Sequence, residues 1–196
     1  GATSDDDHDR HDHDHEEDAE YDEHIWTSIP NAKIILEVIK DALVEYRISF
    51  DEDYSLIEDN YNEYVVLMDE LDEEIREVVA SSETKYLLFG DRFAFRYFTD
   101  EYNLSYSAAF TGCSTVTEPS LRTMTFLTKR IKDSGVPAIL HLEGSSKKVA
   151  ESLSSETKVP ILEFNSMQNI TKNDFENNET YITIMKRNIE VLRSAL

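Results

Sequence analysis

Two long segments near the start of the folded part of the chain have apolar residues at every third or fourth position. This spacing places the apolar residues on one face of a helix. The first segment begins at Ser28, a good N-cap residue, and has Pro30 in its first turn. The second segment covers about residues 52–80. The sequence therefore predicts two consecutive long amphipathic helices.

Beyond residue 80, short apolar runs alternate with helical patterns. The expected strands cover residues 86–89, 105–110, 136–142 and 159–164. The expected helices cover residues 92–102, 118–132, 145–155 and 181–196. Strands that alternate with helices of about 10–15 residues indicate a parallel sheet with crossover helices. We expect an α/β fold, in which a small parallel four-stranded sheet follows the two long helices.

Candidate ligands follow from this sheet, because parallel sheets bind ligands beyond the carboxyl ends of their strands. Asp91 and Glu143 stand at two of these ends, and carboxylate oxygens bind divalent cations. Glu143 has two further interpretations. It could orient a ligand histidine by a hydrogen bond, or it could favour the amino end of the next helix as a negative charge.

The amino-terminal stretch differs sharply in composition from the rest. Residues 1–24 hold twelve acids and one base, which is half of the net charge of −22. Like charges at this density cannot bury a core, so we predict that residues 1–23 form a flexible loop. The overall acidity argues against nucleic acid or an anionic membrane surface as a partner, and it favours cations.

Four histidines interleave with the aspartates of this stretch: His8, His11, His13 and His15. Imidazole and carboxylate are both ligands for divalent transition metals. We predict that these histidines provide auxiliary metal capture. The alternatives are a solvated acidic tail with incidental histidines, or an affinity tag.

A further histidine, His24, stands between the acidic stretch and the first long helix. It opens the sequence His24-Ile-Trp, which leads after three residues into Pro30-Asn-Ala-Lys33. Later come Leu88-Phe-Gly-Asp-Arg-Phe-Ala-Phe95, Glu118-Pro-Ser120 and Asn165-Ser-Met-Gln168. As an ordered set over residues 8–195, these motifs resemble the zinc- and manganese-type solute-binding lipoproteins of ABC transporters, a metal-binding adhesin-like family.

The resemblance implies one lobe of a two-lobed fold like that of periplasmic binding proteins. Residues 1–23 would be the histidine-rich loop, residues 24–80 the linking helix and second helix, and residues 81–196 the carboxy-terminal lobe. The implied function is extracytoplasmic binding of Zn²⁺, or of Mn²⁺, for delivery to a membrane permease, with no enzymatic reaction. The implied location is the cell surface or periplasm, with a lipid anchor outside this sequence.

The resemblance also implies a ligand set, in which His24 binds the metal and Asp91 and Glu143 add oxygen atoms. The match has two departures. The slot after Phe89 that often holds histidine or glutamate has Gly90-Asp91 or Arg92 here, and a late aspartate is replaced by Asn165. Two other functions stay open: a small α/β metallohydrolase using the same three residues, and an interaction lobe that has lost metal binding. The sequence has no HExxH motif, which disfavours the hydrolase.

Overall fold

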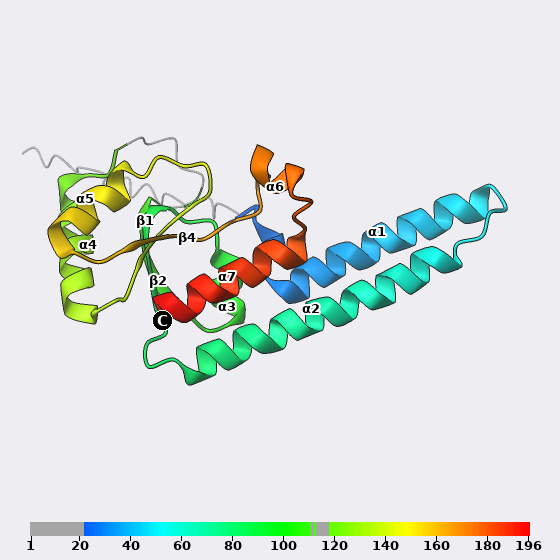
Figure 1. The fold of residues 1–196 in the computed structure, drawn as a ribbon, viewed down its shortest axis with the longest axis horizontal. Helices are drawn as coiled ribbons and strands as arrows, with labels where there is room; N and C mark the ends of the chain where they lie inside the picture. The colour runs from blue at the N-terminus through cyan, green and yellow to red at the C-terminus, as the bar shows by residue number, and fades with distance from the viewer. Residues whose placement is uncertain (1–21, 111, 113–117) are drawn as a thin grey trace, which may run out of the picture.

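The computed structural model describes residues 22–110, residue 112 and residues 118–196 (Figure 1). The predictions for the flexible loop and for the four tail histidines, His8, His11, His13 and His15, lie outside the described residues. Within the described ranges, no helix combines the length and the apolar character needed to cross a membrane.

The chain follows the predicted alternation of helices and strands. The elements are η1 (Ile25–Thr27), α1 (Ile29–Ser49), α2 (Ser55–Ser81), β1 (Tyr86–Arg92), α3 (Arg96–Glu101), β2 (Ser105–Phe110), α4 (Leu121–Ser134), β3 (Ile139–His141), α5 (Lys148–Thr157), β4 (Ile161–Glu163), α6 (Lys172–Glu176) and α7 (Tyr181–Ala195). The two long helices and the four predicted strands are confirmed. Two short elements, η1 and α6, are not in the prediction, because three to five residues are too few to show a period.

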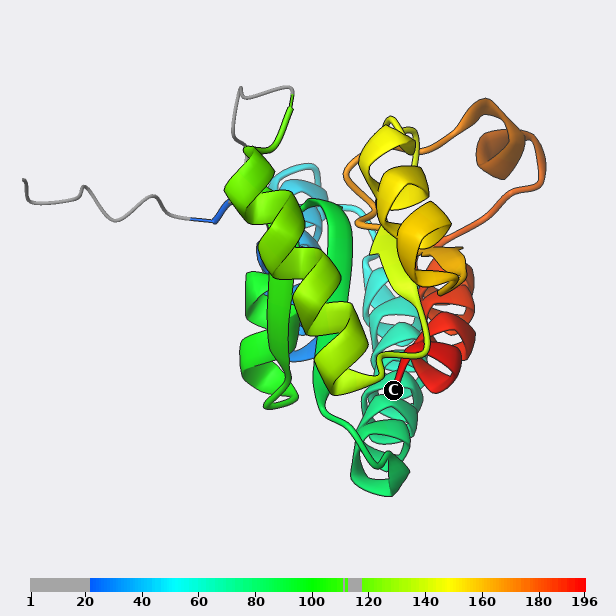
Figure 2. The same ribbon diagram turned by 90° about the vertical axis from the view of Figure 1, so that its left-hand side faces the viewer.

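All pairings in the sheet are parallel, and the strand order is β2-β1-β3-β4. Helices cover both faces (Figures 1 and 2). On one face, Leu127 of α4 and Leu153 of α5 pack against Leu88 and Ile139. On the other face, α2, α3 and α7 surround a core centred on Phe164. This is the expected α/β layering of one binding lobe.

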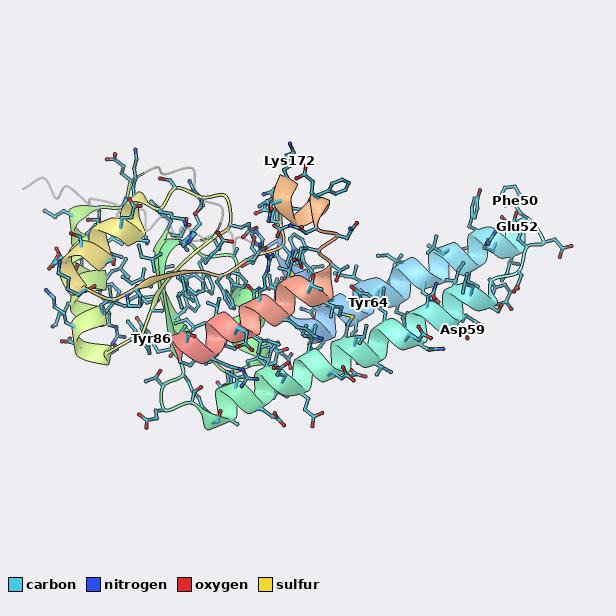
Figure 3. All side chains as sticks on the ribbon, in the orientation of Figure 1. Phe50, Glu52, Asp59, Tyr64, Tyr86 and Lys172 are labelled. Atoms are coloured by element: carbon cyan, nitrogen blue, oxygen red, sulfur yellow. The ribbon has the colours of Figure 1, made fainter. Side chains whose placement is uncertain are left out.

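Helices α1 and α2 form a hairpin that is only partly joined to this lobe. The second half of α2 buries Met68, Leu71 and Ile75 in the lobe core. The first half of α2 and most of α1 extend away from the sheet, and Phe50 and Glu52 lie at the far tip (Figure 3).

The protruding part of the hairpin leaves many large apolar side chains in solvent. Ten of them are between 39% and 68% exposed: Ile34, Val38, Ile39, Leu43, Tyr46, Ile48, Phe50, Leu56, Val66 and Leu67. The helical period in α1 is confirmed, but most of the face that it defines has no partner among the described residues.

Candidate metal site

His24 lies at the start of η1, and both of its ring nitrogens are engaged. The side chain is buried, with 3% of the residue exposed. Its Nδ1 donates to Asp22 Oδ1 at 2.7 Å, and its backbone N–H donates to the same oxygen at 2.9 Å. Its Nε2 faces Gln168 Oε1 at 3.2 Å. The ring is therefore fixed in orientation from two sides, as metal-binding histidines are when a carboxylate holds the second nitrogen.

The protonation of this pair follows from the same contacts. The hydrogen bond to Asp22 raises the pKa of His24 above its ordinary value, and the effect outweighs that of burial, which lowers it. Burial raises the pKa of Asp22, but the hydrogen bonds from the ring and backbone of His24 outweigh it and leave this pKa below its ordinary value. A proton on Nε2 also satisfies the facing oxygen of Gln168.

The loop after β4 brings Gln168 to His24, and hydrogen bonds involving Trp26 and Ser166 hold this region together. Trp26 Nε1 donates to Ser166 O at 2.9 Å, and the Trp26 ring makes an edge contact with His24. The Gln168 backbone N–H donates to Ser166 Oγ at 3.3 Å. Tyr181 Oη, at the start of α7, donates to Trp26 O at 2.9 Å.

Glu143 holds this loop through two hydrogen bonds to Ser166. Its two carboxylate oxygens accept from Ser166, one from the backbone N–H at 2.7 Å and the other from Oγ at 2.6 Å. No direct contact joins Glu143 to His24 among the described residues. Glu143 is therefore linked to the loop that carries Gln168 through Ser166, and its predicted role as a ligand or as an orienting residue stays a prediction.

Asp91 lies at the carboxyl end of β1, and both of its carboxylate oxygens accept hydrogen bonds. One oxygen accepts the Arg92 backbone N–H at 2.7 Å. The other accepts the Leu142 backbone N–H at 3.0 Å and the Ser145 hydroxyl. These bonds fasten β1 to the turn after β3, and no contact joins Asp91 to His24 within the described ranges.

Two other buried polar side chains near this edge have structural partners. His141 is buried, and its Nδ1 donates to Leu142 O at 2.8 Å. Asn165 Oδ1 accepts the Met167 backbone N–H, and the backbone of Asn165 is bonded by Asn188. In the part of the chain that the structure describes, no three His, Cys, Asp or Glu side chains form a group that could hold a metal.

The pair that the structure does bring together is His24 with Gln168, which the sequence analysis did not select as a ligand. A tetrahedral zinc site with bonds of about 2.0–2.1 Å has neighbouring ligand atoms about 3.3 Å apart. The 3.2 Å between Nε2 and Oε1 is a hydrogen-bond distance, and it is also compatible with this spacing. Gln168 could have been found by following the carboxyl-end rule three residues past Asn165.

A parallel α/β lobe with a histidine held at the carboxyl edge of its sheet is the arrangement expected for one lobe of a solute-binding protein. The comparison with protein families agrees. The chain belongs to the family described as ZnuA, zinc-uptake complex component A, periplasmic, whose model matches residues 1–195.

Individual relatives carry zinc in their names. The zinc-binding protein AdcA of Streptococcus pyogenes is 27% identical over 173 residues, covering 88% of this chain and 33% of the relative. The high-affinity zinc uptake system protein ZnuA of Bacillus subtilis is 30% identical, covering 89% of this chain and 53% of the relative. The chain therefore spans about a third to a half of the length of these relatives.

A solved structure gives the same result for the fold. The metal-dependent lipoprotein YcdH of Bacillus subtilis superposes with a TM-score of 0.76 at 28% identity, covering 89% of this chain and 65% of that chain. The predicted fold and the resemblance on which it relied are thereby confirmed.

Proposed function

We propose that the chain is the carboxy-terminal lobe of an extracytoplasmic solute-binding protein that delivers a divalent metal to an ABC-type permease. Zn²⁺ is the proposed cargo, in keeping with the zinc-binding and zinc-uptake relatives. Mn²⁺ is the second candidate, since oxygen ligands suit it. Capture and delivery break no covalent bond, so we propose no enzymatic activity. The comparisons support neither the metallohydrolase nor the interaction lobe.

The observation that carries this proposal is the geometry of His24. Asp22 holds Nδ1, and this leaves Nε2 as the atom that can bind a metal once its proton leaves. We propose Gln168 Oε1 as the adjacent ligand. Asp91 and Glu143, the other predicted ligands, have their oxygens engaged by hydrogen bonds, which favours positioning roles for both.

Two protein ligands do not complete a zinc site, which has four. We propose that a second lobe supplies the rest. The exposed apolar side chains of α1 support this idea, because an extended apolar surface of this kind normally marks a contact with another protein surface. The relatives that this chain matches are also longer than the chain itself.

The proposed location is outside the cytoplasm, at the cell surface or in the periplasm, with a lipid anchor outside this sequence. Relatives described as lipoproteins support this proposal. The net charge of −22 disfavours nucleic acid as a partner and disfavours direct contact with an anionic membrane.

Zinc titration of the full chain tests the ligand assignment. The background carries asparagine in place of His8, His11, His13 and His15, so that the tail histidines cannot mask the site. In this background His24→Ala should weaken zinc binding at least tenfold. Glu163→Gln, which changes a carboxylate at the end of β4, is the control and should bind as the background does. An unchanged dissociation constant for His24→Ala would refute the site.

The same titration separates ligands from positioning residues. If Asp91 is a positioning residue, Asp91→Asn should lower the thermal midpoint while zinc affinity in the folded protein changes less than twofold. If Asp91 is also a ligand, the zinc affinity should fall together with the thermal midpoint. For Glu143→Gln, the zinc affinity and the thermal midpoint distinguish a ligand from a positioning residue in the same way.

A further inference from the structure

Charge is distributed very unevenly over the molecule. Residues 29–81, the α1–α2 hairpin, hold fifteen acids and four bases. Residues 118–158, which include α4 and α5, hold seven bases and five acids, and one of those acids, Glu143, is buried. The α4–α5 layer is therefore slightly basic in a protein whose net charge is −22.

The bases of this layer also differ in their partners. Elsewhere most lysines and arginines pair with a carboxylate, as Lys33 does with Asp69 and Arg193 with Glu74. Five exposed bases on α4 and at the start of α5 have no carboxylate of the described residues within ion-pair distance. They are Arg122, Lys129, Arg130, Lys147 and Lys148, and we refer to them as the basic face.

The basic face begins at the edge of the sheet where the described chain also begins. Helices α4 and α5 follow the carboxyl ends of β2 and β3, so Arg122, Lys147 and Lys148 lie toward that edge. His24 and its partner Asp22 lie at the same edge, beside the loop after β4. The stretch that precedes Asp22 therefore enters the molecule on the side where the basic face starts.

We propose that the acidic stretch before Asp22 docks on the basic face of its own chain. Residues 1–21 hold ten acids and one base, which complements the face in charge. Twenty-one residues can extend about 70 Å, whereas a domain of this length has a radius of gyration of about 16 Å. The stretch is therefore long enough to reach every base of the basic face. Ion pairs with these bases do not require one fixed conformation of the stretch.

Tethering makes such a contact effective although each ion pair is weak. A short linker holds the two charged groups at an effective concentration on the order of millimolar. Residues 1–21 and the hairpin are both acidic and repel each other. This repulsion disfavours the hairpin as a docking surface for residues 1–21. Because exposed charges are screened within about 8–10 Å at physiological ionic strength, docking should disappear at high salt.

Paramagnetic broadening in the full chain tests the proposal. A spin label is placed at Ser4→Cys, with Cys113→Ala to remove the single native cysteine. Amide signals of α4 and of the first turn of α5 should lose at least half of their intensity at low salt. The amides of α1 should not, and about 0.5 M NaCl should restore the signals.

A matched pair of charge reversals identifies the surface. Lys147→Glu with Lys148→Glu should abolish the broadening of α5, and acids at a helix start do not disturb the helix. Lys85→Glu with Lys186→Glu makes the same change in net charge at two other exposed bases without a carboxylate partner, and should leave the broadening intact. Equal effects of the two pairs, or broadening that ignores salt, would overturn the proposal. So would co-sedimentation with phosphatidylglycerol vesicles without any broadening, because a membrane would then be the partner.

Discussion

The hairpin of α1 and α2 and the α/β lobe after it use apolar residues in opposite ways. In the lobe, Phe89, Phe95, Phe98 and Phe164 are at most 1% exposed, and residues 82–196 hold equal numbers of acids and bases, fourteen of each. In the hairpin, eleven large apolar side chains are exposed, and acids outnumber bases almost four to one. An apolar pattern in a sequence therefore shows which face of a helix is apolar, but not whether this chain buries that face.

The largest expected difference between the two regions is in stability. Phe164 contacts the rings of Phe89, Phe95 and Phe98, so Phe164→Ala should cost about 3–5 kcal/mol of unfolding free energy. Val38→Ala on α1 removes a side chain that is 63% exposed and should cost less than about 0.5 kcal/mol. Urea unfolding measures both. A similar cost for the two variants would mean that the exposed face of α1 is covered in solution.

A second difference concerns packing density. A Cβ on Gly90 would lie 2.8 Å from Ala150 Cα and 2.9 Å from its Cβ, because α5 packs directly on β1 there. Gly90→Ala should therefore destabilise the lobe by about 1–3 kcal/mol through overpacking. Ala42→Gly, at an exposed position inside α1, is the control and should cost only the helix propensity, about 1 kcal/mol. If Gly90→Ala is neutral, α5 must move away from the sheet at little cost.

Within this chain, metal affinity should depend on the pair His24 and Gln168 and not on the hairpin. Gln168→Glu places a carboxylate opposite His24 Nε2 and should strengthen zinc binding about tenfold, because an anionic oxygen binds Zn²⁺ better than a neutral amide does. Asn60→Asp adds the same charge to α2 and should change the affinity less than twofold. Calorimetry in the background without tail histidines measures both. Weaker binding by Gln168→Glu would show that Oε1 is not a ligand.

The smallest effect is a pH dependence near neutrality, and it too should come from the His24 side of the molecule. Residues 29–81 contain no histidine. Because the pKa of His24 is raised in the folded protein, its contribution to stability is complete below about pH 6.5, the ordinary value, and is lost as pH rises through the raised pKa. Zinc binding should change in the opposite direction, since the metal displaces the proton.

Asp22→Asn should lower the pKa of His24, as measured from the pH titration of its ring protons. Glu23→Gln is the control, since Glu23 has only a minor electrostatic influence on His24. An unchanged pKa in Asp22→Asn would mean that the 2.7 Å contact between Nδ1 and Asp22 does not persist in solution.

Much of the fold could be predicted because each element carries a local signal. Ser28 caps α1 as expected and accepts the Asn31 backbone N–H, and Gly135 ends α4 with a φ of 61°. The strands β3 and β4 are shorter than predicted, because an apolar run does not show where pairing stops. The face of α1 was predicted correctly as apolar, but its burial depends on partners that periodicity cannot identify.

The site could be predicted only in part. His24 was found from its position before the first long helix, and its partner Gln168 lies 144 residues away. Asp91 and Glu143 stand at the predicted edge, but sequence alone cannot show how many hydrogen bonds a carboxylate already accepts. Only the fold shows that Ser166 and the turn at Leu142 occupy these oxygens.

His24 is joined to the long helix α1 by only a few residues, those of η1 and Ser28. A movement of His24 can therefore be passed on to α1. Only Ser28 separates η1 from a helix of 21 residues, which is about 32 Å long. A rotation of about 10° at the root of such a rod moves its tip by about 5 Å. A movement of His24 that rotated η1 would therefore be largest at Phe50, which lies at the tip of the hairpin farthest from the site (Figure 3).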